Sequence, residues 1–176
     1  MNILIVYDSI FGNTAQVANA MRDELVAAAH TVEIHPVSEA LPFALHDTDL
    51  LIVGSPTRGF RPTPAISEFV EGIDKALVGG RPAAAFDTRM SLDDIHPAPL
   101  RWVVDAGGYA ADRIAQMLSH SGFTAVGTHG GFFVGGTEGP MKPGEIERAR
   151  AWAGDLVAQA APAATVSADV EHRAAS

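Results

Sequence analysis

The stretch Ile3–Ala18 reads Ile-Leu-Ile-Val-Tyr-Asp-Ser-Ile-Phe-Gly-Asn-Thr-Ala-Gln-Val-Ala. Its first five residues form an unbroken apolar run, which is typical of a strand covered on both faces of a parallel sheet. The polar segment Asp8–Thr14 follows and leads into apolar side chains four residues apart, at Val17, Met21 and Leu25, which indicate a helix. The stretch therefore predicts a strand, a tight loop and a helix in immediate succession.

Further strands are indicated along the chain. Thr31–Val37 alternates apolar and polar residues before a proline, which is typical of an edge strand. Phe123–Gly127 predicts a short strand that a polar segment separates from a later apolar run. The remaining apolar runs are interpreted as buried strands: Leu50–Val53, Ala83–Phe86 and Phe132–Val134.

Helical spacing of apolar residues fills most intervals between these strands. Thr63 and Pro64 are expected to cap and begin the second helix, whose apolar stripe runs from Ile66 to Leu77. The resulting element order is β-α-β-β-α-β-α-β-α. It predicts a three-layer α/β fold, with a doubly wound, parallel, five-stranded sheet in the strand order 2-1-3-4-5. We expect one domain over residues 1–160, followed by a flexible alanine-rich tail over 161–176.

Composition narrows the classes of function. The chain has 176 residues, 12 Lys and Arg, 21 Asp and Glu, a formal net charge of −9 and no cysteine. We expect no nucleic-acid partner, because the negative charge repels phosphate backbones, and no membrane insertion, because no apolar run approaches ~20 residues. The lack of cysteine excludes disulfides, a thiol nucleophile and cysteine-ligated metal clusters. A cytoplasmic protein is expected, and any redox chemistry would need an organic cofactor.

Ligands of such sheets bind beyond the carboxyl ends of the strands, where the strand order reverses. Three loops then matter: Asp8–Thr14, Ser55–Thr63 and Thr88–Gly108. In the first loop, the N–H groups of the helix start and the hydroxyls of Ser9 and Thr14 suit a dianionic phosphate. The alternative is that Asn13 and Thr14 only cap the helix.

The second loop carries Phe60 at the tip of a proline-flanked segment. An aromatic side chain there suits a flat ring, whose polar edge the neighbouring backbone groups would bond. The glycine spacings of nucleoside triphosphatases and of dinucleotide-binding folds are absent. The glycines of Gly135–Gly139 are interpreted as turn residues.

The run Ile5-Val6-Tyr7-x-Ser9-x-x-Gly12-x-Thr14-x-x-x-Ala18 resembles the phosphate loop that binds flavin mononucleotide (FMN) in flavodoxins, with Met21 as a slight departure. Gly54–Phe60 is similar to the second flavin loop of flavodoxin-like NAD(P)H:quinone oxidoreductases. The resemblance covers about residues 1–160 and implies a flavodoxin-like fold with FMN as cofactor. It implies cofactor contacts at Ser9, Ile10, Phe11, Gly12, Asn13, Thr14, Ser55, Pro56, Thr57, Arg58, Gly59, Phe60, Asp87, Thr88 and Arg89.

Two departures from the family pattern bear on function. Phe11 stands where electron-carrying flavodoxins usually have a hydroxyl, so one phosphate donor is missing; an aromatic residue there resembles the quinone-reductase branch. The third loop has no tyrosine at the customary stacking place. Trp102 would either stack on the flavin or pack the loop against the core.

Arginines on the predicted flavin loops reverse the overall acidity. Arg58, Arg61 and Arg89 would stabilise an anionic reduced flavin or hold the phosphate of a nicotinamide donor. The alternative for each is a solvated charge or an ion pair with Asp87, Asp93 or Asp94.

The leading hypothesis is an FMN-binding redox protein that transfers electrons between a reductant and an acceptor. Its partners would be a redox protein, or NAD(P)H and a quinone-like acceptor, with the chain as a monomer or homo-oligomer. The alternatives are an FMN-dependent NAD(P)H:quinone oxidoreductase and a cofactor-free interaction or receiver-like module, so enzymatic activity stays open. No catalytic residue is predicted, since His96 and His129 are lone loop histidines. No metal site is predicted either, because the other histidines have no metal-ligand spacing: His30, His35, His46, His120 and His172.

Overall fold

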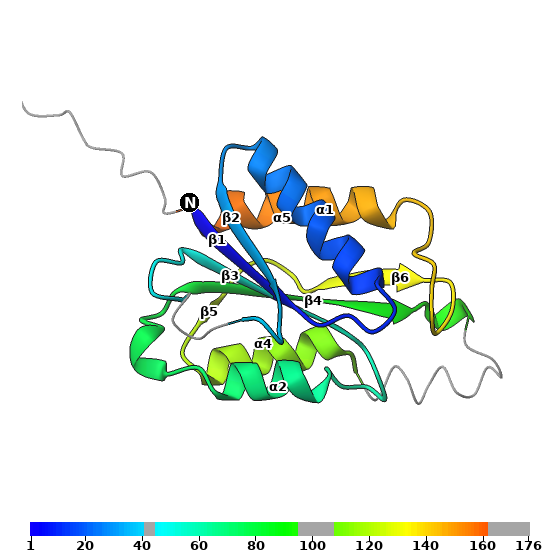
Figure 1. The fold of residues 1–176 in the computed structure, drawn as a ribbon, viewed down its shortest axis with the longest axis horizontal. Helices are drawn as coiled ribbons and strands as arrows, with labels where there is room; N and C mark the ends of the chain where they lie inside the picture. The colour runs from blue at the N-terminus through cyan, green and yellow to red at the C-terminus, as the bar shows by residue number, and fades with distance from the viewer. Residues whose placement is uncertain (41–44, 95–107, 162–176) are drawn as a thin grey trace, which may run out of the picture.

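A parallel sheet separates two layers of helices, as Figure 1 shows. The computed structural model describes residues 1–40, 45–94 and 108–161. The strands follow the order β2-β1-β3-β4-β5, with β6 also paired to β4, and every pair is parallel. Their bounds are β1 Asn2–Tyr7, β2 Thr31–Pro36, β3 Leu50–Pro56, β4 Pro82–Met90, β5 Thr124–Ala125 and β6 Gly130–Val134.

The fifth position of the sheet is divided between two short strands. β5 pairs with Pro82 and Ala83 at the start of β4, whereas β6 pairs with Phe86–Met90 at its end. The division falls where polar residues interrupt the apolar sequence after Phe123–Gly127. The predicted order 2-1-3-4-5 is therefore confirmed, with its last strand in two pieces.

Helices cover both faces of the sheet (Figure 1). α1 (Asn13–Ala27) and α5 (Glu145–Ala160) pack on one face, and α2 (Pro64–Glu71) and α4 (Ala110–His120) pack on the other. The apolar stripe predicted to continue to Leu77 is broken, because α2 ends at Glu71 and Leu77 lies in a separate 3₁₀ turn. Gly72 disfavours a longer helix, and the Asp74 side chain accepts the Ala76 N–H to begin the new turn.

α2 starts where it was predicted to start, but the expected capping bond from Thr63 is not formed. Thr63 is the N-cap residue and Pro64 follows it as the first helical residue. The Thr63 side chain makes no capping bond, and its hydroxyl is buried without a partner among the described residues. The Thr63 N–H instead donates to the Ser55 Oγ at 2.9 Å, so Ser55 ties the end of β3 to the start of this helix.

The core lies on both faces of the central strands. Leu4 and Val6 of β1 face the α2–α4 layer, and Ile3 and Ile5 face the α1–α5 layer. On the latter side the rings of Phe86, Phe132 and Trp152 pack edge to face, with centroids 6.0–6.3 Å apart. This packing joins β4, β6 and α5 on that face of the sheet.

Within the described residues, no helix is long and apolar enough to cross a membrane. α5 ends at Ala160, near the expected end of the domain. Residues 162–176, predicted as a tail, lie outside the described residues, as do Trp102 and His96 in the third loop. Their predicted roles stay predictions.

Candidate functional site

A cleft of about 250 Å³ opens at the carboxyl edge of the sheet. Its walls come from the loop after β1, the loop after β3, the end of β4 and the turn after β6. β1 and β3 are the strands between which the chain order reverses. The cleft therefore lies where a doubly wound sheet of this order binds its ligands.

Most residues predicted to contact a cofactor line this cleft. Those on its walls are Ile10, Phe11, Asn13, Thr14, Pro56, Thr57, Arg58, Gly59, Thr88 and Arg89. The other predicted residues stand next to these without lining the cleft: Ser9, Gly12, Ser55, Phe60 and Asp87.

The loop after β1 presents a row of backbone donors. Gly12 is the N-cap of α1 and has a φ of +86°, a left-handed conformation that glycine adopts without strain. No residue in the described ranges accepts a hydrogen bond from the backbone N–H groups of residues 10–14. They lie at the positive end of the α1 dipole, which makes the loop a ready anion site.

Side chains of the same loop brace the start of α1, although its N-cap residue Gly12 has no side chain to cap it. The Ser9 Oγ accepts the Ala15 N–H at 3.2 Å, and the Asn13 amide donates to the Glu138 carbonyl at 2.9 Å. The Thr14 and Thr88 hydroxyls lie 2.8 Å apart in a buried contact between loop and sheet. The alternative that Asn13 and Thr14 serve only as caps therefore does not describe this helix start, whose N-cap is Gly12.

The loop after β3 turns sharply beside the cleft. Arg58 and Arg61 exchange two backbone hydrogen bonds of 2.9 and 3.1 Å, and Gly59 and Phe60 between them both have positive φ. The Phe60 carbonyl accepts the Nε–H of Arg113 from α4, and its half-buried ring does not line the cleft. The expectation that Phe60 covers a flat ring stays a prediction.

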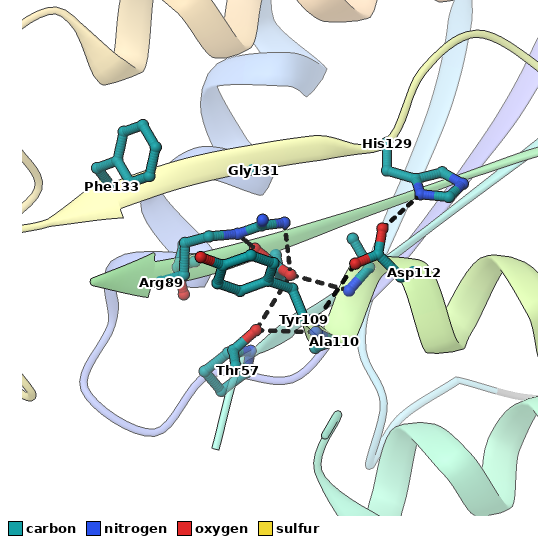
Figure 2. A network of polar contacts seen from close by, with 12 residues as sticks. Thr57, Arg89, Tyr109, Ala110, Asp112, His129, Gly131 and Phe133 are labelled. Carbon is teal, nitrogen blue, oxygen red and sulfur yellow. Dashed lines mark hydrogen bonds and ion pairs between the residues drawn. The ribbon is translucent and has the colours of Figure 1, made fainter. Parts of the chain in front are cut away.

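A buried carboxylate lies next to the cleft without lining it. Asp87, on β4, has no exposed surface, and both of its oxygens accept hydrogen bonds from Arg89, with Nη2 to Oδ2 at 2.8 Å. Asp87 Oδ2 also accepts the Thr57 hydroxyl and the Ala111 N–H, while the Thr57 Oγ1 accepts the Ala110 N–H (Figure 2). Burial raises the pKa of Asp87 above its ordinary value, and Arg89 and the other donors offset part of that rise.

The Arg89 guanidinium occupies a narrow slot. Its Cζ lies 3.6 Å from the centroid of the Tyr109 ring, at the start of α4. A Cβ at Gly131 on β6 would lie 2.6 Å from the same atom, so the missing side chain there makes room for the guanidinium. Figure 2 shows Arg89 between these two elements, and only 14% of its side chain is exposed.

A family model described as the flavodoxin domain matches residues 4–101, which include the first two loops of the cleft and the end of β4. The chain belongs to the flavodoxin family. Flavodoxins are flavin-binding electron-transfer proteins that typically bind FMN. A comparison with curated protein sequences gives no match.

Solved structures of flavodoxins share the fold. An archaeal flavodoxin superposes with a TM-score of 0.70 at 18% identity, over 91% of this chain and 99% of its own. Flavodoxin 1 from Bacillus cereus gives 0.69 at 16% identity, over 90% and 98%. A WrbA-like protein from Agrobacterium tumefaciens gives 0.63 at 20% identity, over 90% and 96%. At these identities the likeness establishes the fold alone.

One wall of this flavodoxin's cleft escaped the sequence analysis. Val134, Gly136 and Thr137 line the cleft, although the glycine-rich segment after β6 was interpreted only as a turn. It is a turn, since the Gly139 N–H donates to the Gly136 carbonyl, and it also packs against α1 through Asn13. The available signal was its place in the chain, because the turn after the fifth strand reaches the same edge of the sheet.

The arginines of the flavodoxin site differ from one another. Arg89 forms the ion pair with Asp87 that was one of its two interpretations. Arg58 and Arg61 are exposed, and neither forms an ion pair within the described ranges. Arg58 is therefore the arginine whose charge faces the cleft without a counter-ion from those residues.

Acidic and histidine side chains nearby make structural contacts. His129 Nδ1 lies 2.8 Å from Asp112, whose other oxygen accepts the Tyr109 N–H at the start of α4. In the part of the chain that the structure describes, no three His, Cys, Asp or Glu residues are grouped to hold a metal ion.

Proposed function

We propose that this chain binds FMN in the cleft and transfers electrons through it between a reductant and an acceptor. The observation that carries the proposal is the row of backbone N–H groups of residues 10–14, which have no acceptor among the described residues. Polar backbone groups that no protein atom satisfies at a helix start favour an anion, and FMN ends in a phosphate dianion.

The rest of the cleft suits the other parts of FMN. Pro56, Met90 and Val134 offer apolar surface for a flat ring, and the backbone of Thr57–Gly59 lies beside it with polar groups. The residues that would hold the group are thus residues 10–14 at the phosphate, and the loop after β3 with the end of β4 at the ring. When bound, the flavin supplies hydride and electron-transfer chemistry that no side chain here provides.

The protein's own part is to bind and orient. The Thr14–Thr88 contact joins the phosphate loop to β4, so the two halves of the cleft keep a fixed separation. The bonds from Thr57 to Asp87 and from the Ala110 N–H to Thr57 hold the loop after β3 against α4. A cleft preformed in this way lowers the entropic cost of ordering a cofactor.

A second candidate function is an FMN-dependent NAD(P)H:quinone oxidoreductase. The exposed Arg58 on the cleft wall favours it, because a guanidinium suits the phosphate of a nicotinamide dinucleotide. Phe11, nearly half exposed at the mouth, adds an aromatic surface. Anaerobic addition of NADH or NADPH to the FMN-loaded protein separates the two: rapid bleaching that a quinone reverses supports the enzyme, and a lasting oxidised spectrum supports a carrier.

A ligand titration tests the proposed function. Quenching of FMN fluorescence measures affinity, with riboflavin, which lacks the phosphate, as the comparison ligand. We expect FMN to bind at least about tenfold more tightly than riboflavin, since charge-assisted bonds contribute about 1.5–3 kcal/mol. Absence of FMN binding after reconstitution, or equal affinity for the two flavins, would contradict the proposal.

A pair of matched variants locates the binding. Thr14→Val removes a hydroxyl that lines the cleft, and we expect it to weaken FMN binding about fivefold. Thr124→Val makes the same chemical change on β5, which pairs with the opposite end of β4. It should leave the affinity unchanged; an equal loss in both variants would argue against binding in this cleft.

A further inference from the structure

The Asp87–Arg89 pair holds two opposite charges in fixed positions beside the cleft. Both carboxylate oxygens of Asp87 are occupied by donors from three elements: Arg89 on β4, Thr57 after β3 and Ala111 of α4. A side chain that is wholly buried and fully bonded cannot itself contact a ligand. Its influence on the cleft must act through the partner that does line it, Arg89.

Arg89 is held in one orientation from three sides. Asp87 binds Nε and Nη2, and the Tyr109 ring covers one face of the guanidinium. Gly131 on β6 lies so close that a Cβ there would be 2.6 Å from Cζ. A guanidinium that makes two parallel bonds to a carboxylate is fixed in angle as well as in distance. The positive charge at the cleft wall therefore has a constant position and a buried counter-charge.

Resting on the proposed function, we propose that Asp87 is a positioning residue that neutralises Arg89 and thereby lowers the redox potential of the bound flavin. Reduced flavin tends toward an anion, and an unbalanced cation beside the cleft would stabilise it. The buried carboxylate cancels that cation. Although two further arginines lie on the loop after β3, the pair at the end of β4 adds no net charge to the site.

The redox potential of the bound flavin can be obtained from two binding affinities. It rises when the dissociation constant for oxidised FMN increases relative to that for reduced FMN, that is, when the ratio of the two increases. In Asp87→Asn, Arg89 keeps its charge and loses its counter-ion. At an effective dielectric constant near 20, a unit charge about 10 Å away changes an anion's energy enough for roughly a tenfold change in this ratio. For a two-electron couple, a tenfold change is a rise of about 30 mV.

The double variant Asp87→Asn/Arg89→Gln is the matched control, since it removes both charges and retains polar side chains. We expect the double variant to reverse most of the shift in the ratio that Asp87→Asn causes, because no unbalanced charge remains. A double variant that shifts as far as Asp87→Asn, or an Asp87→Asn protein with an unchanged ratio, would overturn the proposal, because the effect would then not come from the charge on Arg89.

The experiment is an anaerobic redox titration of the FMN-loaded full chain at pH 7, with separate titrations of oxidised FMN into each variant. If the unmodified protein binds no FMN, the proposed function fails and this inference falls with it. If FMN binds, but Asp87→Asn leaves the ratio unchanged or the double variant shifts it equally, only the proposed charge role of Asp87 fails. Should Asp87→Asn not fold, Asp87→Ser makes the same charge change with a smaller side chain and the same expected tenfold shift.

Discussion

Two walls of the cleft, the loop after β1 and the end of β4, differ in whether their polar groups already have partners within the protein. The loop after β1 carries no charged side chain between Ser9 and Thr14, keeps its backbone donors open, and exposes 46% of both Ile10 and Phe11. The end of β4 carries the wholly buried carboxylate of Asp87 and the mostly buried guanidinium of Arg89, which are bonded to each other. The loop after β1 has backbone donors without an acceptor among the described residues, whereas the charged groups at the end of β4 are bonded to each other.

The difference assigns separate contributions to the two walls. Backbone N–H groups without an acceptor gain most from a ligand, so the loop after β1 supplies affinity. The Asp87 network has no carboxylate bond left to offer, so the β4 wall supplies rigidity and a set charge. Variants on the β4 wall should therefore affect stability strongly, whereas variants at the tip of the first loop should affect affinity and leave stability nearly unchanged.

The largest effect is expected for Arg89→Gln, which leaves the Asp87 carboxylate buried without its counter-ion. Removing one partner of a buried pair costs about 3 kcal/mol or more. Urea unfolding of the protein without ligand, at pH 8, measures the loss. The double variant Asp87→Asn/Arg89→Gln should recover most of it, because no buried charge remains unpaired. A loss below about 1 kcal/mol would show that the pair contributes little to this wall.

The stability of the Arg89→Gln variant should also depend on pH. The raised pKa of Asp87 means that the folded chain holds this proton more tightly than the unfolded chain does. Stability therefore falls as pH rises from the ordinary carboxyl pKa of about 4 through the folded-state pKa. Without Arg89 that pKa moves higher still, so Arg89→Gln should be more stable at pH 5 than at pH 8. The double variant, which has no carboxyl at this position, should lack this dependence.

Gly131→Ala tests the slot from its other side. The added Cβ would lie 2.6 Å from the Arg89 Cζ, and the guanidinium cannot retreat because Tyr109 and Asp87 hold it. Overpacking of this kind costs about 2 kcal/mol. Gly135→Ala is the nearby control, since its Cβ would meet only the Pro140 carbonyl at 3.7 Å. Equal melting temperatures for the two variants would show that Arg89 moves freely.

The first wall could be predicted from the sequence because it is local. A buried strand, a glycine at the helix start and the hydroxyls around it all lie within Ile3–Ala18, and their spacing determines their geometry. The edge position of β2 followed in the same way from its alternation and its proline. Short-range patterns suffice when neighbours in the chain are neighbours in space.

The second wall could be predicted only in part because it is assembled from distant segments. Asp87 and Arg89 are two residues apart on β4, so their shared face of the strand was available from the sequence. Tyr109 and Gly131 were not: the ring meets Arg89 through the start of α4, and the glycine through β6. No local pattern indicates that a glycine in a strand makes room for an arginine on its neighbour.

Phe11→Ser gives the smallest effect and the sharpest contrast between the walls. The serine hydroxyl would add a donor to a loop whose backbone already favours an anion, and we expect FMN to bind about fivefold more tightly, or about 1 kcal/mol. Phe11 is 46% exposed, so unfolding free energy should change by less than about 0.5 kcal/mol. Phe11→Ala separates the two causes, since it removes the ring without adding a hydroxyl. A gain in Phe11→Ala equal to that in Phe11→Ser would mean that the ring obstructs the mouth, and that the first wall lacks no donor.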